Sequence, residues 1–154
     1  MAKPMLTPEY LVGYFDAFSN SDFDKMASYY HDDIVLTFPG IALGGKHRGI
    51  EHIVGMFKGV QQMFKGTLKF KCTWAAVCGD RGVVQWYTEG HPFQGGHYKN
   101  RGCVVWTFKD GKIIEFEDYL DTDIVSAFVP GGVPTPPPAN VDEITAKAFH
   151  PDFP

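Results

Sequence analysis

The sequence predicts an α+β fold: a cone-shaped α+β barrel in which three N-terminal helices pack on a curved antiparallel sheet. Two observations predict it. Apolar residues recur mainly at helical spacing as far as Phe64, whereas alternation with period two dominates from Thr67 onward. The long alternating runs are joined by short turns such as the one at residues 79–82, which is typical of an antiparallel meander.

The first half contains three predicted helices and one short strand. Thr7 followed by Pro8 and an acid predicts a helix start, and helical spacing continues to about residue 19. A second cap at residues 21–24 predicts a short helix to about residue 30, which His31-Asp32-Asp33 then ends. Residues 34–38 predict a short strand, and residues 50–64 predict the third helix, with one apolar face.

The second half contains four predicted strands, over residues 67–78, 82–90, 98–108 and 111–121. One helical turn is predicted at residues 123–128. Together, residues 1–128 predict one domain. Residues 129–154 form a Pro/Gly-rich C-terminal tail, which we expect either to be disordered or to lie over the sheet, a cavity mouth or another subunit.

Composition excludes several classes of function. The net charge of −4 and the absence of a Lys/Arg run argue against nucleic-acid binding. No apolar stretch is long enough to span a membrane, and the first residues lack the apolar core of a signal peptide. Three cysteines without a Cys-x-x-Cys motif argue against a disulfide scaffold and predict a cytoplasmic location.

Asp118 is the most informative residue. Side chains alternate along a strand, so Asp118 shares a face with Ile114, Phe116 and Leu120, while the opposite face is mostly polar. A carboxylate on a buried face is costly unless it is paired, hydrogen-bonded or protonated. The sequence therefore leaves two interpretations open: a proton-transfer group, or a carboxylate bound to a backbone amide or an Arg.

The same alternation predicts which other side chains point inward. On the strand at residues 98–108 the inward set includes Tyr98, Asn100 and Trp106. Trp74 is predicted to share the inner face of the first long strand with Leu68, Phe70 and Cys72. The strand at residues 82–90 offers two sets, and a single bulge would reverse either choice.

Several stretches resemble the NTF2-like superfamily, and within it the SnoaL-like branch that includes limonene epoxide hydrolase. The resemblance covers about residues 7–128 and rests on the order and spacing of short motifs. These are Tyr14-Phe15-Asp16-Ala17-Phe18, Asp22-Phe23-Asp24, Tyr29-Tyr30-His31-Asp32-Asp33, Gly45-Lys46-His47-Arg48-Gly49-Ile50, and the run from Asp110 to Asp121. The resemblance implies the fold more strongly than the reaction, because this fold hosts many functions.

The resemblance can be tested one position at a time. Ketosteroid isomerase-like members place a base Asp where this chain has Phe38, and their second acid falls near Val104, so their reaction is not expected. Limonene epoxide hydrolase has a water-activating Asp at the position of Asp118. Its Arg and second Asp fall within residues 85–89, which contain no Arg, and its water-holding Tyr and Asn fall near residues 36 and 38.

These positions define a predicted site. Asp118 is the expected general base, Tyr14 or Tyr87 the donor to a developing oxyanion, and Glu89 or His91 the second proton carrier. The resemblance favours the inward set Gln85, Tyr87 and Glu89. The predicted substrate-binding residues are Gln85, Tyr87, Tyr98, Asn100, Trp106, Phe116, Phe38 and Trp74.

Simpler interpretations exist for several of these residues. Tyr14 also fits a core aromatic, and His91 and His97 flank a turn where solvated side chains are usual. The His-x5-His spacing is too weak to predict a metal site. No Gly-rich phosphate loop follows a strand, so we expect no metal and no cofactor.

The sequence therefore predicts a cofactor-independent enzyme that uses acid/base proton transfer on a small hydrophobic, cyclic or aromatic substrate, of lyase, isomerase or cyclase type. The alternatives are an epoxide hydrolase-like enzyme and a non-catalytic ligand-binding or assembly domain. A narrow cavity, or one without a second polar group near Asp118, would favour the non-catalytic domain. The mixed charges of the outer sheet face, with the family resemblance, predict a homodimer or homotrimer.

Overall fold

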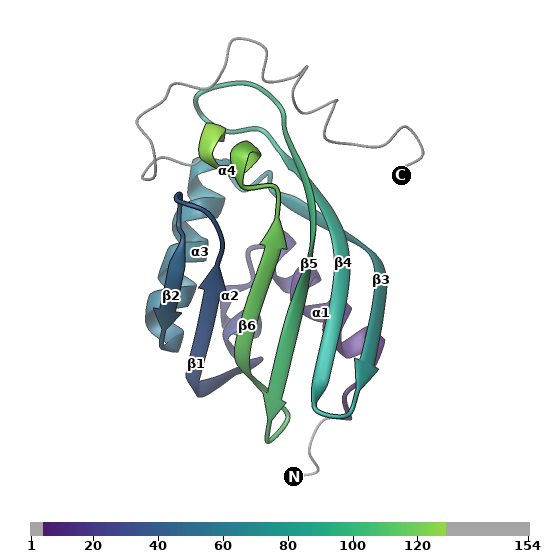
Figure 1. The fold of residues 1–154 in the computed structure, drawn as a ribbon. Helices are drawn as coiled ribbons and strands as arrows, with labels where there is room; N and C mark the ends of the chain where they lie inside the picture. Colours follow the sequence, from purple (N-terminus) through teal and green to yellow (C-terminus); the bar gives the residue numbers. More distant parts are fainter. Residues whose placement is uncertain (1–4, 129–154) are drawn as a thin grey trace.

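The computed structural model describes residues 5–128 and consists of four helices and six strands (Figure 1). In chain order these are α1 (Pro8–Ser19), α2 (Phe23–Ala27), β1 (Tyr30–Phe38), β2 (Gly45–Arg48), α3 (Ile50–Met63), β3 (Lys69–Cys78), β4 (Arg81–Gly90), β5 (Tyr98–Lys109), β6 (Lys112–Leu120) and α4 (Thr122–Phe128). The predicted tail, residues 129–154, lies outside the described residues.

One curved six-stranded sheet, in the order β2-β1-β6-β5-β4-β3, carries the fold. The predicted meander is confirmed, since β3 to β6 pair antiparallel in succession. The sheet as a whole is mixed, because β1 runs parallel to β6 and β2 pairs antiparallel with β1. Helices α1, α2 and α3 lie behind the sheet and α4 lies across one end, as the predicted cone-shaped α+β barrel requires (Figure 1).

The N-terminal elements match the prediction except around residue 30 and at β2, a short strand that the sequence did not predict. The Thr7 hydroxyl caps α1 by accepting a hydrogen bond from the Tyr10 amide at 3.1 Å. The predicted second helix is shorter than expected, because Tyr30 already begins β1 and is paired with Ile113 of β6. The run His31-Asp32-Asp33 therefore lies within β1, in the irregular stretch between Tyr30 and Val35, which both pair with β6.

Two register shifts change which side chains face inward. Between Cys72 and Trp74 the β3–β4 pairing slips by one residue, and Trp74 emerges on the outer face, 56% exposed. Its predicted place on the inner face is wrong for this reason. A second shift, between β5 and β6, puts Ile113 in the core instead of Ile114, while Phe116 and Asp118 keep the predicted inner face.

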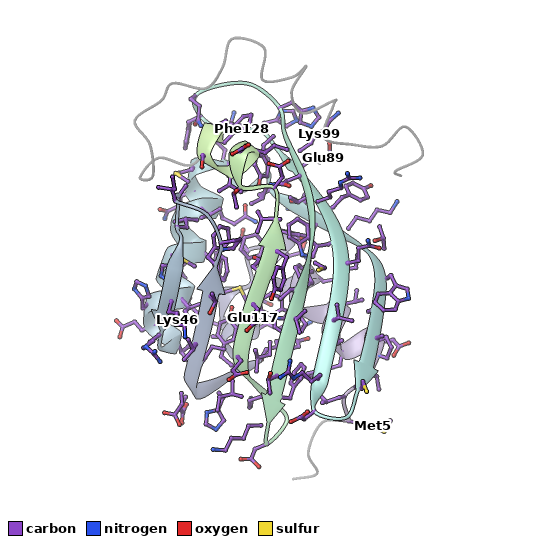
Figure 2. All side chains as sticks on the ribbon, in the orientation of Figure 1. Met5, Lys46, Glu89, Lys99, Glu117 and Phe128 are labelled. Carbon is purple, nitrogen blue, oxygen red and sulfur yellow. The ribbon has the colours of Figure 1, made fainter. Side chains whose placement is uncertain are left out.

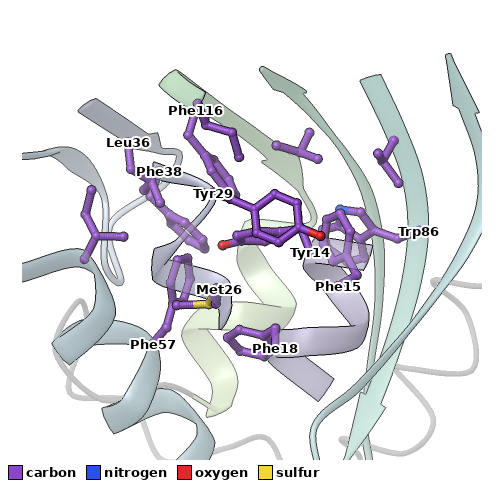
Figure 3. Close-up of a cluster of buried hydrophobic side chains, with 14 of the residues drawn as sticks. Tyr14, Phe15, Phe18, Met26, Tyr29, Leu36, Phe38, Phe57, Trp86 and Phe116 are labelled. Carbon is purple, nitrogen blue, oxygen red and sulfur yellow. The ribbon is translucent and has the colours of Figure 1, made fainter. Parts of the chain in front are cut away.

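Aromatic rings fill the space between α1 and the sheet (Figure 3). Tyr14 packs edge-on against Trp106 at 5.1 Å and Phe116 at 5.8 Å, and Phe15 stacks on Trp106 at 5.7 Å between ring centroids. Such contacts stabilise the core beyond the burial of apolar area. This aromatic cluster packs against the inner face of β6, the strand that carries Asp118.

None of the helices in the described part of the chain is long and apolar enough to cross a membrane.

Candidate active site

Asp118 lies on the inner face of β6, directly opposite the buried Val104 of β5. Its neighbours on the same face are Phe116 and Leu120, as the alternation predicted. The Oδ1 atom is buried and has no hydrogen-bond partner among the described residues. Of the alternative predicted from sequence, a carboxylate bound to a backbone amide or an Arg, the amide contact is present, because the Tyr119 backbone amide donates to the Asp118 carboxyl.

Burial raises the pKa of Asp118 to about 7, because the apolar surroundings disfavour the charged form. A hydrogen bond from the Tyr119 backbone amide acts in the opposite direction and only partly offsets this. A carboxyl with a pKa near neutrality can both accept and release a proton at physiological pH. Perturbed groups of this kind concentrate at functional sites.

A cavity of about 60 Å³ opens beside Asp118; we call it the Asp118 cavity. Its walls are mostly apolar and come from the sheet, from helices α1, α3 and α4, and from the segment after β1. The described residues that line it are Phe18, Phe38, Leu43, Phe57, Val60, Phe64, Leu68, Phe70, Trp86, Thr88, Tyr98, Asp118, Leu120 and Val125. This volume is about that of two water molecules, so a ring-sized ligand requires the walls to move apart.

Besides Thr88, whose hydroxyl donates to the Lys69 carbonyl oxygen, two polar groups accompany Asp118 in the cavity wall. The Tyr98 hydroxyl accepts a hydrogen bond from Asn100 Nδ2 at 3.0 Å, which leaves its own proton available to a ligand. Burial raises the pKa of Tyr98, and the nearby Asp118 charge adds to this effect, so the phenol stays protonated. The second group is Trp86, whose indole N–H is buried and has no partner in the described part of the chain.

Tyr14 belongs to a different layer. Its hydroxyl is 2.5 Å from that of Tyr30, and it is not among the described residues that line the Asp118 cavity. This arrangement matches the interpretation of Tyr14 as a core aromatic with its hydroxyl satisfied. Burial raises the pKa of Tyr14 well above its ordinary value. The neighbouring Tyr30 hydroxyl and the Asp118 charge raise this pKa further.

The predicted inward set on β4 is wrong. Gln85 and Glu89 are exposed and Tyr87 is half-buried on the outer face, whereas Trp86 and Thr88 point into the barrel. The resemblance had favoured the wrong alternation, and the apolar content of the opposite set was the signal that could have found it. Figure 2 shows Glu89 close to its strand partner Lys99, near the end of the sheet at which α4 lies.

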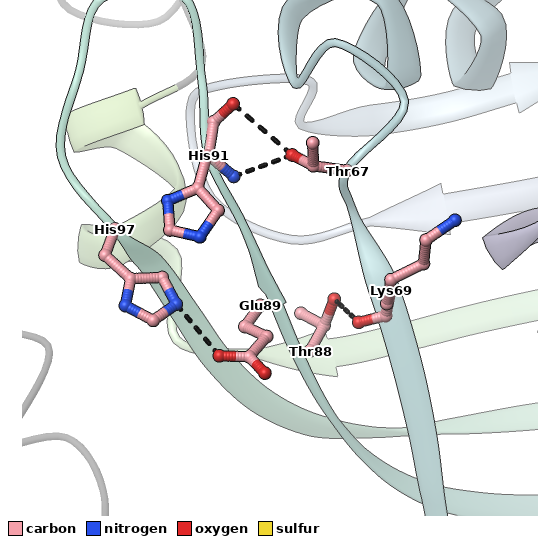
Figure 4. Close-up of polar contacts among 6 residues, drawn as sticks. All are labelled: Thr67, Lys69, Thr88, Glu89, His91 and His97. Carbon is pink, nitrogen blue, oxygen red and sulfur yellow. Dashed lines mark hydrogen bonds and ion pairs between the residues drawn. The ribbon is translucent and has the colours of Figure 1, made fainter.

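His91 and Glu89 are also absent from the Asp118 cavity, so their predicted role as second proton carrier there is not supported by their placement. Glu89 Oε2 instead contacts His97 Nε2 at 2.8 Å, and the His91 and His97 rings stack at 4.5 Å (Figure 4). Thr67 accepts a hydrogen bond from the His91 amide at 2.8 Å. Within residues 5–128 no group of three or more His, Cys, Asp or Glu side chains is arranged to hold a metal ion.

The predicted site residues thus divide into three groups. Asp118, Tyr98 and Phe38 line the cavity, and Asn100 supports Tyr98 from behind. Others are buried in the core next to it: Tyr14, Trp106 and Phe116. The rest lie outside the barrel: Gln85, Tyr87, Glu89, His91 and Trp74.

Comparison with known proteins agrees with the fold. A family model described as the SnoaL-like domain matches residues 11–116. The solved structures that resemble the chain include Bal32a from a soil-derived mobile gene cassette, at 21% identity and a TM-score of 0.73, covering 79% of this chain and 94% of that one. No curated protein matches the sequence.

Two further similar structures contain bound small molecules. TerC, co-crystallised with polyporic acid, is 24% identical with a TM-score of 0.70, covering 81% of this chain and 100% of that one. A protein of ketosteroid isomerase-like fold from Catenulispora acidiphila, in complex with trimethylamine, is 18% identical with a TM-score of 0.69, covering 80% and 94%. At these sequence identities the likeness concerns the fold alone.

Proposed function

The chain belongs to the SnoaL-like domain family, and from this premise we propose that it is a cofactor-independent enzyme that transfers a proton to or from a small hydrophobic ring compound. The observation that carries the proposal is Asp118: its carboxyl lines an apolar cavity, and one buried oxygen has no hydrogen-bond partner among the described residues. A fold that only needed to be stable would gain by replacing this group, because an uncompensated buried carboxylate costs free energy.

The proposed roles follow from the geometry. Asp118 acts as general base and then returns the proton as general acid, which its pKa near 7 permits. Tyr98 donates a hydrogen bond to the oxygen on which negative charge develops. Apolar walls exclude water and lower the local dielectric, which strengthens both interactions.

We favour lyase, isomerase or cyclase chemistry over epoxide hydrolysis. The positions at which the resemblance would place the partner groups of a hydrolase, Gln85, Tyr87 and Glu89, lie away from the cavity on the outer face. Two proteins of similar fold were crystallised with small organic molecules, polyporic acid and trimethylamine. That proteins of this fold were crystallised with small organic molecules supports ligand binding by this chain, without specifying its substrate.

A second candidate is a non-catalytic ligand-binding domain. The observation that favours it is the small volume of the Asp118 cavity, about 60 Å³, which is less than the 150 Å³ or so of a cavity known to hold benzene. A binding domain needs no proton transfer, so the two candidates differ in a directly measurable property.

The discriminating experiment is deuterium incorporation at the carbons next to the carbonyl of small cyclic ketones, cyclopentanone first, followed by NMR in D2O. Wild-type protein should accelerate incorporation, and Asp118→Asn should abolish the acceleration. Glu117→Gln is the matched control, because Glu117 is the adjacent carboxylate on the exposed face of the same strand. Equal rates for wild type and Asp118→Asn across the ketones would favour the binding domain.

A further inference from the structure

Trp86 carries a buried hydrogen-bond donor that the fold does not use. Its indole ring is almost completely buried on the inner face of β4, and no described residue accepts from Nε1. Buried indole N–H groups usually have a partner, because leaving one unsatisfied costs desolvation free energy. An unused donor of this kind therefore requires a physical explanation.

The strand next to β4 leaves space for the Trp86 ring. Trp86 pairs with Gly102 of β5. A Cβ at position 102 would lie 3.0 Å from Trp86 Cζ2, which is two bonds from Nε1 in the indole ring. Gly102 in turn pairs with Leu120 of β6, which also lines the Asp118 cavity. The ring thus extends over a position without a side chain, toward the strand that carries Asp118. Phe70 packs edge-on against the Trp86 ring, with 4.9 Å between the ring centroids.

Trp86 and Asp118 line the same small cavity, and each has one buried polar atom without a hydrogen-bond partner among the described residues. The two atoms are complementary, since Nε1 can only donate and an ionised Oδ1 can only accept. No Lys, Arg or His is among the described residues of the lining. A ligand carrying a negative charge would therefore meet Asp118 without a compensating cation.

This inference rests on the proposed function. We propose that Trp86 is a second donor that positions the substrate beside Tyr98, donating from Nε1 to the carbonyl oxygen of an uncharged cyclic ketone. Asp118 removes a proton from the carbon next to that carbonyl. The C–H bond breaks and an O–H bond forms at Asp118, while the electron pair moves into the ketone to give an enolate. The charge develops on the oxygen that Trp86 holds, and return of the proton to carbon restores the carboxylate.

Trp106 provides a matched control within the same chain. Its Nε1 is also buried and has no partner among residues 5–128, but Trp106 is not among the described residues that line the Asp118 cavity. Replacing either tryptophan by Phe removes an indole N–H and the same ring volume. Only the replacement of Trp86 should change the recognition of oxygen.

The test measures the affinity of the full-length chain for cyclopentanone and for its oxygen-free counterpart cyclopentane, by NMR titration. Wild type should bind the ketone more tightly than the hydrocarbon. Trp86→Phe should weaken ketone binding about tenfold and change cyclopentane binding less than about twofold, which is the loss of one buried hydrogen bond. Trp106→Phe should change both affinities by the same factor.

Several outcomes would overturn the inference. The first is a wild-type protein that binds cyclopentanone and cyclopentane with equal affinity. The second is a Trp86→Phe variant that loses affinity for both ligands by the same factor. A selective loss in Tyr98→Phe with none in Trp86→Phe would leave Tyr98 as the donor to the oxygen and remove Trp86 from that role.

Deuterium exchange separates this inference from the proposed function. If Asp118→Asn leaves exchange unchanged while Trp86→Phe still loses the ketone selectively, the enzyme proposal fails and the oxygen contact stands. If Asp118→Asn abolishes exchange while Trp86→Phe retains the wild-type kcat and KM, the enzyme proposal stands and the role of Trp86 fails.

Discussion

Trp86 and Gly102 face each other across the β4–β5 pair, and the tryptophan ring occupies the space that a side chain at 102 would need. A Cβ at Gly102 would also lie 2.1 Å from the backbone oxygen of Tyr119, far inside contact distance. The absence of a side chain at this position therefore shapes both the sheet and the cavity wall.

Gly102→Ala should destabilise the fold by about 3 kcal/mol or more, because backbone, and not a flexible side-chain tip, has to move. Chemical denaturation of the purified variant measures this. Gly55→Ala is the control, since a Cβ at Gly55 on α3 meets nothing within 4 Å. That change should stabilise by about 0.5–1 kcal/mol through helix propensity. Equal effects of the two substitutions would contradict the packing role of Gly102.

Asp118→Asn should stabilise the protein at alkaline pH and have little effect under acidic conditions. The pKa of Asp118 is raised from 3.8 to about 7, so the folded state holds its proton more tightly than the unfolded state. Stability from this group is therefore complete below about pH 4 and falls as the pH rises through 7. The full difference corresponds to about 4 kcal/mol as an upper bound.

The measurement is urea denaturation of wild type and Asp118→Asn between pH 4 and pH 8, taking the difference so that other titrating groups cancel. The difference should grow across this range and level off above pH 7. A difference that is constant with pH would mean that Asp118 titrates normally.

Catalysed exchange should depend on pH in the opposite way from stability. The base form of Asp118 increases as pH rises through about 7, so the deuteration rate should climb over this range and then level off. The 13C chemical shift of the labelled Asp118 carboxyl reports the same transition independently. A carboxyl that finishes titrating near pH 4 would remove the physical basis for a base at this site.

The Tyr14–Tyr30 hydrogen bond should couple the two residues energetically. Each single Phe substitution leaves one buried hydroxyl without its 2.5 Å partner and should cost about 1–3 kcal/mol. The double substitution removes both hydroxyls, so it should cost less than the sum of the single changes. Denaturation of the four proteins in this cycle measures the coupling, and strict additivity would show that the contact contributes nothing.

We also propose that a second copy of the chain covers the outer face of the sheet. Trp74 and Tyr119, 56% and 51% exposed, lie there in one row of paired residues.

Trp74→Glu should therefore convert the oligomer to monomers, as light scattering after size-exclusion chromatography would show. Phe93→Glu is the control, because Phe93 is a similarly exposed aromatic residue on the β4–β5 loop. A wild-type protein that is already monomeric at high concentration would refute the proposal.

Local sequence determined most of the element boundaries. The capped start of α1, the apolar face of α3 and the alternation of β4, β5 and β6 are encoded by neighbouring residues, and these elements form within about two residues of their predicted limits. The inner-face position of Asp118 followed from alternation alone, because β5 pairs with β6 without a shift from Gly102 to Val105. Burial of that carboxylate, and hence a candidate site, was predictable from sequence.

Tertiary structure decided the rest of the site. A one-residue slip between β3 and β4 moved Trp74 outward, and partner strands set which set of β4 side chains faces the barrel, so that Trp86 and Thr88 replaced Gln85 and Glu89. Pairing of Tyr30 with Ile113 of β6 also makes residues 30–33, a predicted helix end, part of β1. The physical reason is common to all three: backbone hydrogen bonds between distant strands fix the register, and a shift of one residue reverses every side chain that follows.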